Sequence, residues 1–255
     1  MGGIAGDFTG FKFGDRHSSD LGITRVSNGS RYSENLLPNL QDVSGQVPGG
    51  DGTYYWGSNY TQKSFSINFA FDDLTEQQFN DLKSWLGTKE IKQLIFDENE
   101  YKYYMAKVGA PPEINFIGFE VDGKNIYKGE GTIQFVCYYP YAKSTQTFGL
   151  NNGKINNDGI MAADFTFEFN KSESEIVFTL EPYGLTLSSF EYKGNDVKVR
   201  YNSKANLLEG INEQGALTNN LYNEYIIAGD FFKIPVGEST FTGKVENLQF
   251  QKIYY

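Results

Sequence analysis

Residues 64–86, SFSINFAFDDLTEQQFNDLKSWL, carry the two clearest structural signals of the chain. Apolar side chains alternate with polar or small ones up to Phe71, and this period of two predicts a half-buried β-strand. Thr75 and Gln78 match the pattern of a capping box, which satisfies free N–H groups at the start of a helix. The predicted helix ends before Gly87, and its apolar side chains share one face: Phe79, Leu82, Trp85 and Leu86.

Strand patterns surround this helix on both sides. Aromatic and branched residues gather in the segments 11–13, 21–26, 91–97, 101–108, 115–121 and 126–139. These segments favour a mainly antiparallel sheet that contains one strand–helix–strand segment. Cys137 lies inside the last of them, and we interpret it as a small buried apolar residue.

The composition becomes polar after Ala142, and we place a domain boundary near residue 143. Short alternating segments then recur about every 8–12 residues, a spacing typical of a β-sandwich or jelly roll. The expected strands are 165–169, 176–180, 185–192, 197–201, 225–228, 231–234 and 245–250. The sequence therefore predicts a mainly β chain with one helix, divided into an N-terminal domain over 1–142 and a C-terminal β-sandwich over 143–255.

A stretch rich in chain breakers lies at about 44–60 and contains three successive aromatic residues. Asp51-Gly52 is a typical hairpin turn, so we interpret the stretch as a protruding arm. Tyr and Trp dominate the buried centres of protein interfaces, and this interpretation is preferred over a sugar-stacking platform built from the same aromatic residues. The expected subunit-interface residues are Pro48, Gly49, Asp51, Gly52, Tyr54, Tyr55, Trp56 and Tyr60.

Composition excludes several classes of protein. The 255 residues include 22 Lys and Arg against 32 Asp and Glu, and the formal charge of −10 argues against a surface that clamps DNA phosphates. No run of about 18 apolar residues occurs and the N-terminus lacks a secretory pattern, so we expect no membrane insertion. A single Cys and a single His exclude an intrachain disulfide and metal sites that need two of either residue.

The residues that could carry chemistry have simpler interpretations. Two acidic segments, Asp72-Asp73 and the turn 97–100, would serve glycoside hydrolysis or calcium binding only if their carboxylates converged. A simpler interpretation is that the first favours the start of a helix and the second is a solvated loop. His17 lies near Ser and Asp without a nucleophile elbow, and we interpret it as a surface loop residue. Cys137 has no visible activating group, and the Gly-rich segment 48–52 lacks the Lys-Ser/Thr of a P-loop. We expect no catalytic residue, no metal and no cofactor.

An ordered series of segments resembles the distal tail protein family of long-tailed, non-contractile bacteriophages (siphophages) and their prophage relatives. The series covers nearly all of residues 10–142 and consists of 48–57, 64–71, 73–79, 82–86, 94–98, 101–104 and 128–142. Its last segment reads KGEGTIQFVCYYPYA. A weaker match, GDFFKIPVGESTF at 229–241, is similar to a turn before a late strand of the family's C-terminal domain.

The resemblance implies a structural virion protein, not an enzyme. Family members form hexameric rings at the far end of the tail tube, and the ring-building N-terminal domain embraces the next subunit with a belt, which would correspond here to about 44–60. The C-terminal domain would be a galectin-like sandwich on which receptor-binding or baseplate proteins dock. The implied partners are the major tail tube protein, a tail-associated hub or lysin protein and the tape-measure protein. DNA would pass through the ring without specific binding.

The same resemblance places the protein at the tail tip of the virion, after synthesis in the cytoplasm of the bacterial host. An alternative function from a different class is a carbohydrate-binding protein that recognises bacterial surface polysaccharide through its sandwich. The residues after Ala142 suffice for a bare sandwich and leave no room for a large inserted carbohydrate-binding module. This length argues against the alternative.

Overall fold

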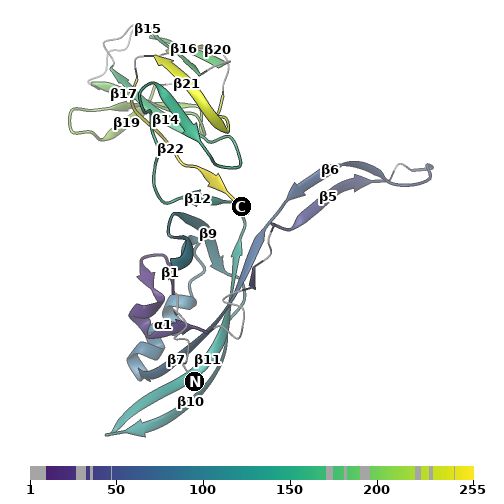
Figure 1. Ribbon diagram of the computed structural model, residues 1–255, viewed down its shortest axis with the longest axis vertical. Coiled ribbons are helices and arrows are strands. Elements are labelled where there is room, and N and C mark those ends of the chain that lie inside the picture. The colour runs from purple at the N-terminus through teal and green to yellow at the C-terminus, as the bar shows by residue number, and fades with distance from the viewer. Residues whose placement is uncertain are drawn as a thin grey trace, which may run out of the picture. The chain divides into compact units, whose positions relative to one another are not determined.

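The computed structural model describes residues 10–26, 33–34, 37–46, 48–170, 175–180, 183–189, 196–221, 225–229, 232–243 and 245–255. The chain divides into two compact units, Met1–Ala142 with Tyr255 and Lys143–Tyr254 (Figure 1). Strands dominate both units, and α1 (Glu76–Leu86) is the single α-helix of the described residues. No helix in that part of the chain is long and apolar enough to cross a membrane. The predicted fold class, mainly β with one helix, is confirmed.

The sheet of the first unit is centred on two long antiparallel neighbours, β7 (Lys63–Thr75) and β11 (Lys124–Cys137). Its strand order is β2-β1-β8-β9-β11-β7-β3, while β10 pairs with β11 and β4 pairs with β7. The other elements are β1 (Phe11–Phe13), β2 (Arg16–His17), η1 (Ser18–Leu21), β3 (Ile23–Arg25), β4 (Ser33–Glu34), β8 (Lys92–Phe96), η2 (Asp97–Asn99), β9 (Lys102–Val108) and β10 (Glu113–Val121). The alternating side chains of β7 are almost fully buried, as their period predicts: Phe65, Ile67, Phe69 and Phe71.

Helix α1 packs its apolar face onto this sheet. It begins with the predicted capping box, in which the Gln78 N–H donates to the Thr75 hydroxyl and the Thr75 N–H donates to the Gln78 side chain. Trp85 stacks on Phe11 with ring centres 5.6 Å apart, and its indole N–H donates to the Phe13 carbonyl at 3.0 Å. All four residues of the predicted apolar face are buried: Phe79, Leu82, Trp85 and Leu86.

The described residues of the second unit form a β-sandwich of two five-stranded sheets, ordered β13-β21-β15-β16-β20 and β19-β18-β17-β14-β22. Side chains from both sheets fill one core, including Phe167 and Tyr201 from one sheet and Leu180 and Phe241 from the other. The bounds are β12 (Ala142–Ser144), β13 (Lys154–Asn157), β14 (Phe165–Asn170), β15 (Glu175–Leu180), β16 (Tyr183–Ser189), β17 (Lys198–Asn202), β18 (Leu207–Ile211), β19 (Leu217–Asn220), β20 (Tyr225–Gly229), β21 (Gly237–Gly243), β22 (Glu246–Phe250) and β23 (Ile253–Tyr254).

The second unit departs from the expected strands in two ways. In the described part of segment 231–234, Ile234 makes an isolated bridge with Ala163 and no strand forms. Pro235 follows at once and has no N–H with which to extend a ladder. Six strands lie in segments that the sequence did not predict as strands: β12, β13, β18, β19, β21 and β23. Residues 190–192 of another expected strand lie outside the described residues.

Candidate functional site

The segment expected to form an arm is a hairpin of two largely exposed strands, β5 (Leu40–Gly45) and β6 (Tyr54–Tyr60). Within the described residues these strands pair only with each other, as a sheet separate from the main sheet (Figure 1). Their register runs from Leu40 opposite Tyr60 to Gly45 opposite Tyr54. The pairing therefore begins at Leu40, earlier in the sequence than the expected start of the arm near 44.

The turn of this hairpin holds four of the expected interface residues, and all four are exposed: Pro48, Gly49, Asp51 and Gly52. Gly49 and Gly52 have φ values of 83° and 91°, a backbone conformation that strongly favours glycine. A Cβ at either position would meet no atom within 4 Å. The positive φ angles of the turn, and not a steric clash with neighbouring atoms, therefore explain why glycine occupies these two positions.

Three successive aromatic residues of β6 point largely into solvent: Tyr54, Tyr55 and Trp56 are 57%, 64% and 67% exposed. A β-bulge shifts the register between Val43 and Ser44, and Trp56 is the extra residue on the facing strand. A Cβ at Gly45 would lie 2.6 Å from the Trp56 ring, so this glycine makes room for the indole. The bulge and Gly45 together set the position of the indole on the arm.

Side-chain hydrogen bonds connect the two strands of the arm, and aromatic rings pack at its base. The Tyr55 and Ser58 hydroxyls are hydrogen-bonded to each other, and Ser58 donates to the Asp42 carboxylate on the facing strand. At the base, the Tyr60 ring meets the Tyr141 and Tyr255 rings edge-on, with centres 6.3 Å and 6.5 Å apart. Tyr60 is thus the expected interface residue that packs onto the body of its own chain.

The same ring cluster has an electrostatic effect at the base of the arm. Burial raises the pKa of the Tyr141 phenol, and the neighbouring Tyr255 and Tyr60 add smaller contributions in the same direction. The Tyr141 hydroxyl is therefore harder to ionise than the hydroxyl of an exposed tyrosine. The cluster acts as a packed aromatic support for β6 where it continues into β7.

A second exposed apolar surface lies on β10, which the sequence predicted as a strand without indicating its exposure. Among the described strands, β10 pairs only with β11. Phe116 packs on Phe79 of α1 with ring centres 4.8 Å apart, and the residues that alternate with it point to the opposite face of the strand. That opposite face presents large apolar side chains that are 41–73% exposed: Ile117, Phe119 and Val121. Alternation alone predicts a strand but not which of its faces is covered.

The only histidine lies between Ser19 and Asp97. Its Nδ1 is 2.6 Å from the Ser19 hydroxyl, and its Nε2 is 2.9 Å from a carboxylate oxygen of Asp97. These side chains also shape the backbone: His17 Nδ1 accepts the Ser19 N–H, Asp20 accepts the His17 N–H, and Asp97 accepts the Gly10 N–H. His17 is therefore a half-buried cap of η1, whereas the sequence predicted a plain surface loop residue.

The other candidate groups are engaged in separate structural contacts. Asp72 pairs with Lys128 at 2.7 Å, and the hydrogen bond raises the pKa of that lysine. Glu98 pairs at 2.8 Å with the buried Arg25, so the acidic turn is held in place and is more than a solvated loop. Burial raises the pKa of the Cys137 thiol to about 12, as expected for a small buried side chain. The described residues contain no group of three side chains suited to hold a metal ion.

Comparison with known proteins relates this architecture to phage tails. Residues 17–137 match the family model of the phage tail protein RIFT-related domain. The crystal structure of the Dit protein of phage SPP1, described as a paradigm of the hub adsorption apparatus in phages that infect Gram-positive bacteria, matches with a TM-score of 0.68 and 11% identity. That match covers 97% of this chain and 99% of the SPP1 chain.

Two structures of the phage P2 baseplate in its activated conformation also match, one with Ca and one with Sr. Their TM-scores are 0.47 and 0.48, with 11% and 10% identity, over 97% and 96% of this chain and 98% and 97% of theirs. No curated protein matches the sequence. The family match and the SPP1 Dit fold together confirm the resemblance that the ordered segments of residues 10–142 indicated.

Proposed function

Because residues 17–137 match the model of the phage tail protein RIFT-related domain and the chain folds like the Dit protein of phage SPP1, we propose that it is the distal tail hub of a siphophage or prophage. In this role six copies form a closed ring at the end of the tail tube. The first unit builds the ring, and the arm lies across the next subunit. The second unit is a galectin-like sandwich that serves as a docking platform.

The exposed aromatic arm is the observation that carries this proposal. Exposed apolar surface is unfavourable in water by roughly 25 cal/mol per Å², and three adjacent aromatic rings of β6 are more than half exposed. A ring requires head-to-tail contacts that close on themselves. An arm that reaches over the neighbouring subunit supplies such a contact and removes the rings from water. The expected contact residues are Pro48, Gly49, Asp51, Gly52, Tyr54, Tyr55, Trp56 and Tyr60.

The apolar face of β10 supports the same proposal independently of the arm. Contiguous large apolar side chains on a surface typically mark a site where another molecule binds. Ile117, Phe119 and Val121 form such a row on one face of the strand. Two apolar surfaces on one unit suit a subunit that contacts a neighbour on each side.

The remaining parts of the proposal concern partners and location. The ring joins the major tail tube protein to a tail-associated hub or lysin protein, with the tape-measure protein and receptor-binding or baseplate proteins as further partners. The net charge of −10 suits passage of DNA without specific binding. The protein has a structural role that needs neither catalysis nor a cofactor. It is made in the host cytoplasm and resides at the tail tip.

The test replaces Tyr54, Tyr55 and Trp56 together by Ser in the full chain. Tyr101→Ser is the matched control, because Tyr101 is an exposed aromatic residue of the same unit that lies outside the arm. Assembly is measured as solution mass, with a ring expected at about 173 kDa, six times the 28.8 kDa of one chain. Incorporation is measured by complementing a phage whose own copy of the gene is disabled.

We expect the triple variant to keep its circular dichroism spectrum while it loses rings and complementation, and we expect the control to keep both. A triple variant that still forms rings and restores infectious tails would show that the arm is not the subunit contact. Tails that assemble normally without any copy of the protein would overturn the hub role itself.

A further inference from the structure

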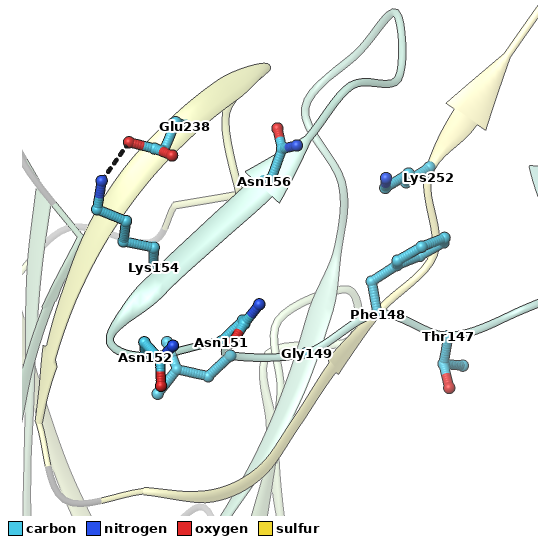
Figure 2. Close-up of a pocket in the computed structure, with 10 residues that line it drawn as sticks. Thr147, Phe148, Gly149, Asn151, Asn152, Lys154, Asn156, Glu238 and Lys252 are labelled. Carbon is cyan, nitrogen blue, oxygen red and sulfur yellow. Dashed lines mark hydrogen bonds and ion pairs between the residues drawn. The ribbon is translucent and has the colours of Figure 1, made fainter.

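The second unit contains a cavity of about 670 Å³ beside the start of its first sheet (Figure 2). This size falls within the range of about 300–1,000 Å³ that is usual for small-ligand sites. The wall combines carboxamides, an ion pair and an aromatic ring: Phe148, Asn151, Asn156, Lys154, Glu238 and Lys252. Nothing in the proposed ring role of the first unit uses this cavity.

Local chain geometry holds the wall in place. Asn152 and Gly153 have φ values of 50° and 76° and form a tight turn, which the paired backbone bonds between Asn151 and Lys154 close at 2.9 Å. Along β13, Lys154 and Asn156 are exposed while the residue between them is buried in the core. The turn and the strand therefore direct polar side chains to the outside of the sandwich on the cavity side.

Close backbone packing at one glycine fixes part of the cavity wall. A Cβ at Gly149 would lie 2.7 Å from the Leu248 carbonyl oxygen, so a larger residue does not fit there. Gly149 is one of the lining residues. The close approach of the two backbones therefore requires glycine at this point of the cavity wall.

The charges at the cavity are already neutralised. Lys154 pairs with Glu238 at 2.6 Å across β13 and β21. Lys252 pairs with Asp158 at 2.7 Å, and its ammonium also lies 3.9 Å from the centre of the Phe148 ring. Because each lysine has a carboxylate partner, the cavity offers no uncompensated positive charge to a phosphate.

The carboxamides, by contrast, are available. Among the described residues, the side chains of Asn151 and Asn156 have no hydrogen-bond partner. In Figure 2 these two amides and the Lys252 ammonium surround the same space, with the Phe148 ring beside it. A carboxamide presents one acceptor oxygen and two N–H donors. Such groups match a ligand whose neighbouring hydroxyls both donate and accept.

We propose that this cavity binds a neutral saccharide. The Asn151 and Asn156 amides would bond to sugar hydroxyls, and the half-buried Phe148 ring would supply the apolar part of the wall. A bare sandwich thereby carries a sugar site without an inserted module. The site belongs to the second unit alone, so it does not depend on ring formation.

The test titrates the ¹⁵N-labelled full chain separately with glucose, galactose, rhamnose and N-acetylglucosamine, and with inorganic phosphate as the anionic probe. Side-chain and backbone amide signals of Asn151 and Asn156 report binding. The Asn151→Ala/Asn156→Ala variant removes both amides, and Gln93→Ala removes an exposed amide of the first unit as the matched control.

We expect at least one sugar to shift these signals saturably while phosphate does not. The double variant should bind that sugar about tenfold more weakly, as the loss of neutral hydrogen bonds implies, and the control should bind it unchanged. Three outcomes would overturn the proposal: no saturable shift with any of the four sugars, shifts with phosphate alone, or a double variant with undiminished affinity.

Discussion

Hydrogen bonds to a charged side chain connect neighbouring strands on the outer face of one sheet in the second unit. Glu168 on β14 accepts hydrogen bonds from Arg200 at 2.7 Å and from the Asn247 amide at 2.8 Å. Burial taken alone raises the pKa of this carboxyl, but the hydrogen bonds from Arg200 and Asn247 outweigh it, and the pKa lies below its ordinary value. The folded state therefore stabilises the ionised form of Glu168.

This pKa shift makes the contribution of Glu168 to stability dependent on pH. Because the pKa is lowered on folding, the contribution is complete above the unfolded value of about 4.3 and is lost as pH falls through the folded value. Glu168→Gln should lower the free energy of unfolding at neutral pH by about 1–2 kcal/mol, since hydrogen bonds to charged groups contribute about 1.5–3 kcal/mol and Gln keeps one of them. The difference from wild type should shrink toward zero in acid.

Urea unfolding at a series of pH values measures this difference. Glu113→Gln is the control, because Glu113 is an exposed residue of β10, and its effect should be small at every pH. A Glu168→Gln penalty that is the same at neutral and acidic pH would mean that the carboxylate charge is not what stabilises this face.

At the scale of elements, Trp85 is one of the four buried side chains that pack α1 onto the sheet. The indole is buried, stacks on Phe11 and donates to the Phe13 carbonyl. Trp85→Ala should lower the free energy of unfolding by about 3–5 kcal/mol, as a large core truncation does. Trp85→Phe should cost less, because it keeps most of the packing and loses only the hydrogen bond.

Thermal unfolding of the full chain, followed by circular dichroism, measures both Trp85 variants. We expect Trp85→Ala to lower the unfolding midpoint more than Trp85→Phe does. An unchanged midpoint for Trp85→Ala would show that the helix does not depend on this side chain.

Helix α1 and strand β7 could be predicted from sequence because burial imposes their periods. Every second residue of β7 from Phe65 to Phe71 enters the core, and the apolar residues of α1 recur at helical spacing. The capping box from Thr75 to Gln78 is equally local, so it could also be identified without coordinates. Features set by neighbouring residues and by burial on one face are the ones that sequence predicts well.

The surfaces that bear on function were less predictable, for a physical reason. The β5 strand has five exposed residues and one half-buried residue, so no burial pattern marked its start at Leu40. The apolar row on β10 looked like any core strand, because its exposure depends on which elements cover it. The cavity of the second unit lies in a segment around Asn151 that resembles a polar linker, and its wall is completed by Glu238 of β21 and by Lys252, both distant in the sequence.

At the scale of the whole molecule, the last residue of the chain belongs to the first unit, although the residues before it belong to the second. The backbone oxygen of Tyr255 accepts from the Tyr104 hydroxyl at 2.9 Å and from the Lys102 ammonium at 3.0 Å, both in the first unit. Within the second unit, the Ser144 N–H donates to the Lys252 carbonyl at 2.9 Å, and the Lys252 N–H donates to the Ser144 hydroxyl at 3.0 Å. The second unit thus fastens its own two ends together.

This closure leads us to predict that a fragment of residues 143–254 folds by itself. It contains both sheets, their shared core and the bonds between Ser144 and Lys252, and it omits Tyr255, which belongs to the first unit. We expect dispersed amide spectra and a cooperative thermal transition. A shorter fragment, 147–254, loses the Ser144 bonds and should be less stable by about 1–3 kcal/mol. Collapsed spectra from the 143–254 fragment would mean that the sandwich requires the first unit in order to fold, and equal stability of the two fragments would mean that the end-to-end bonds contribute nothing.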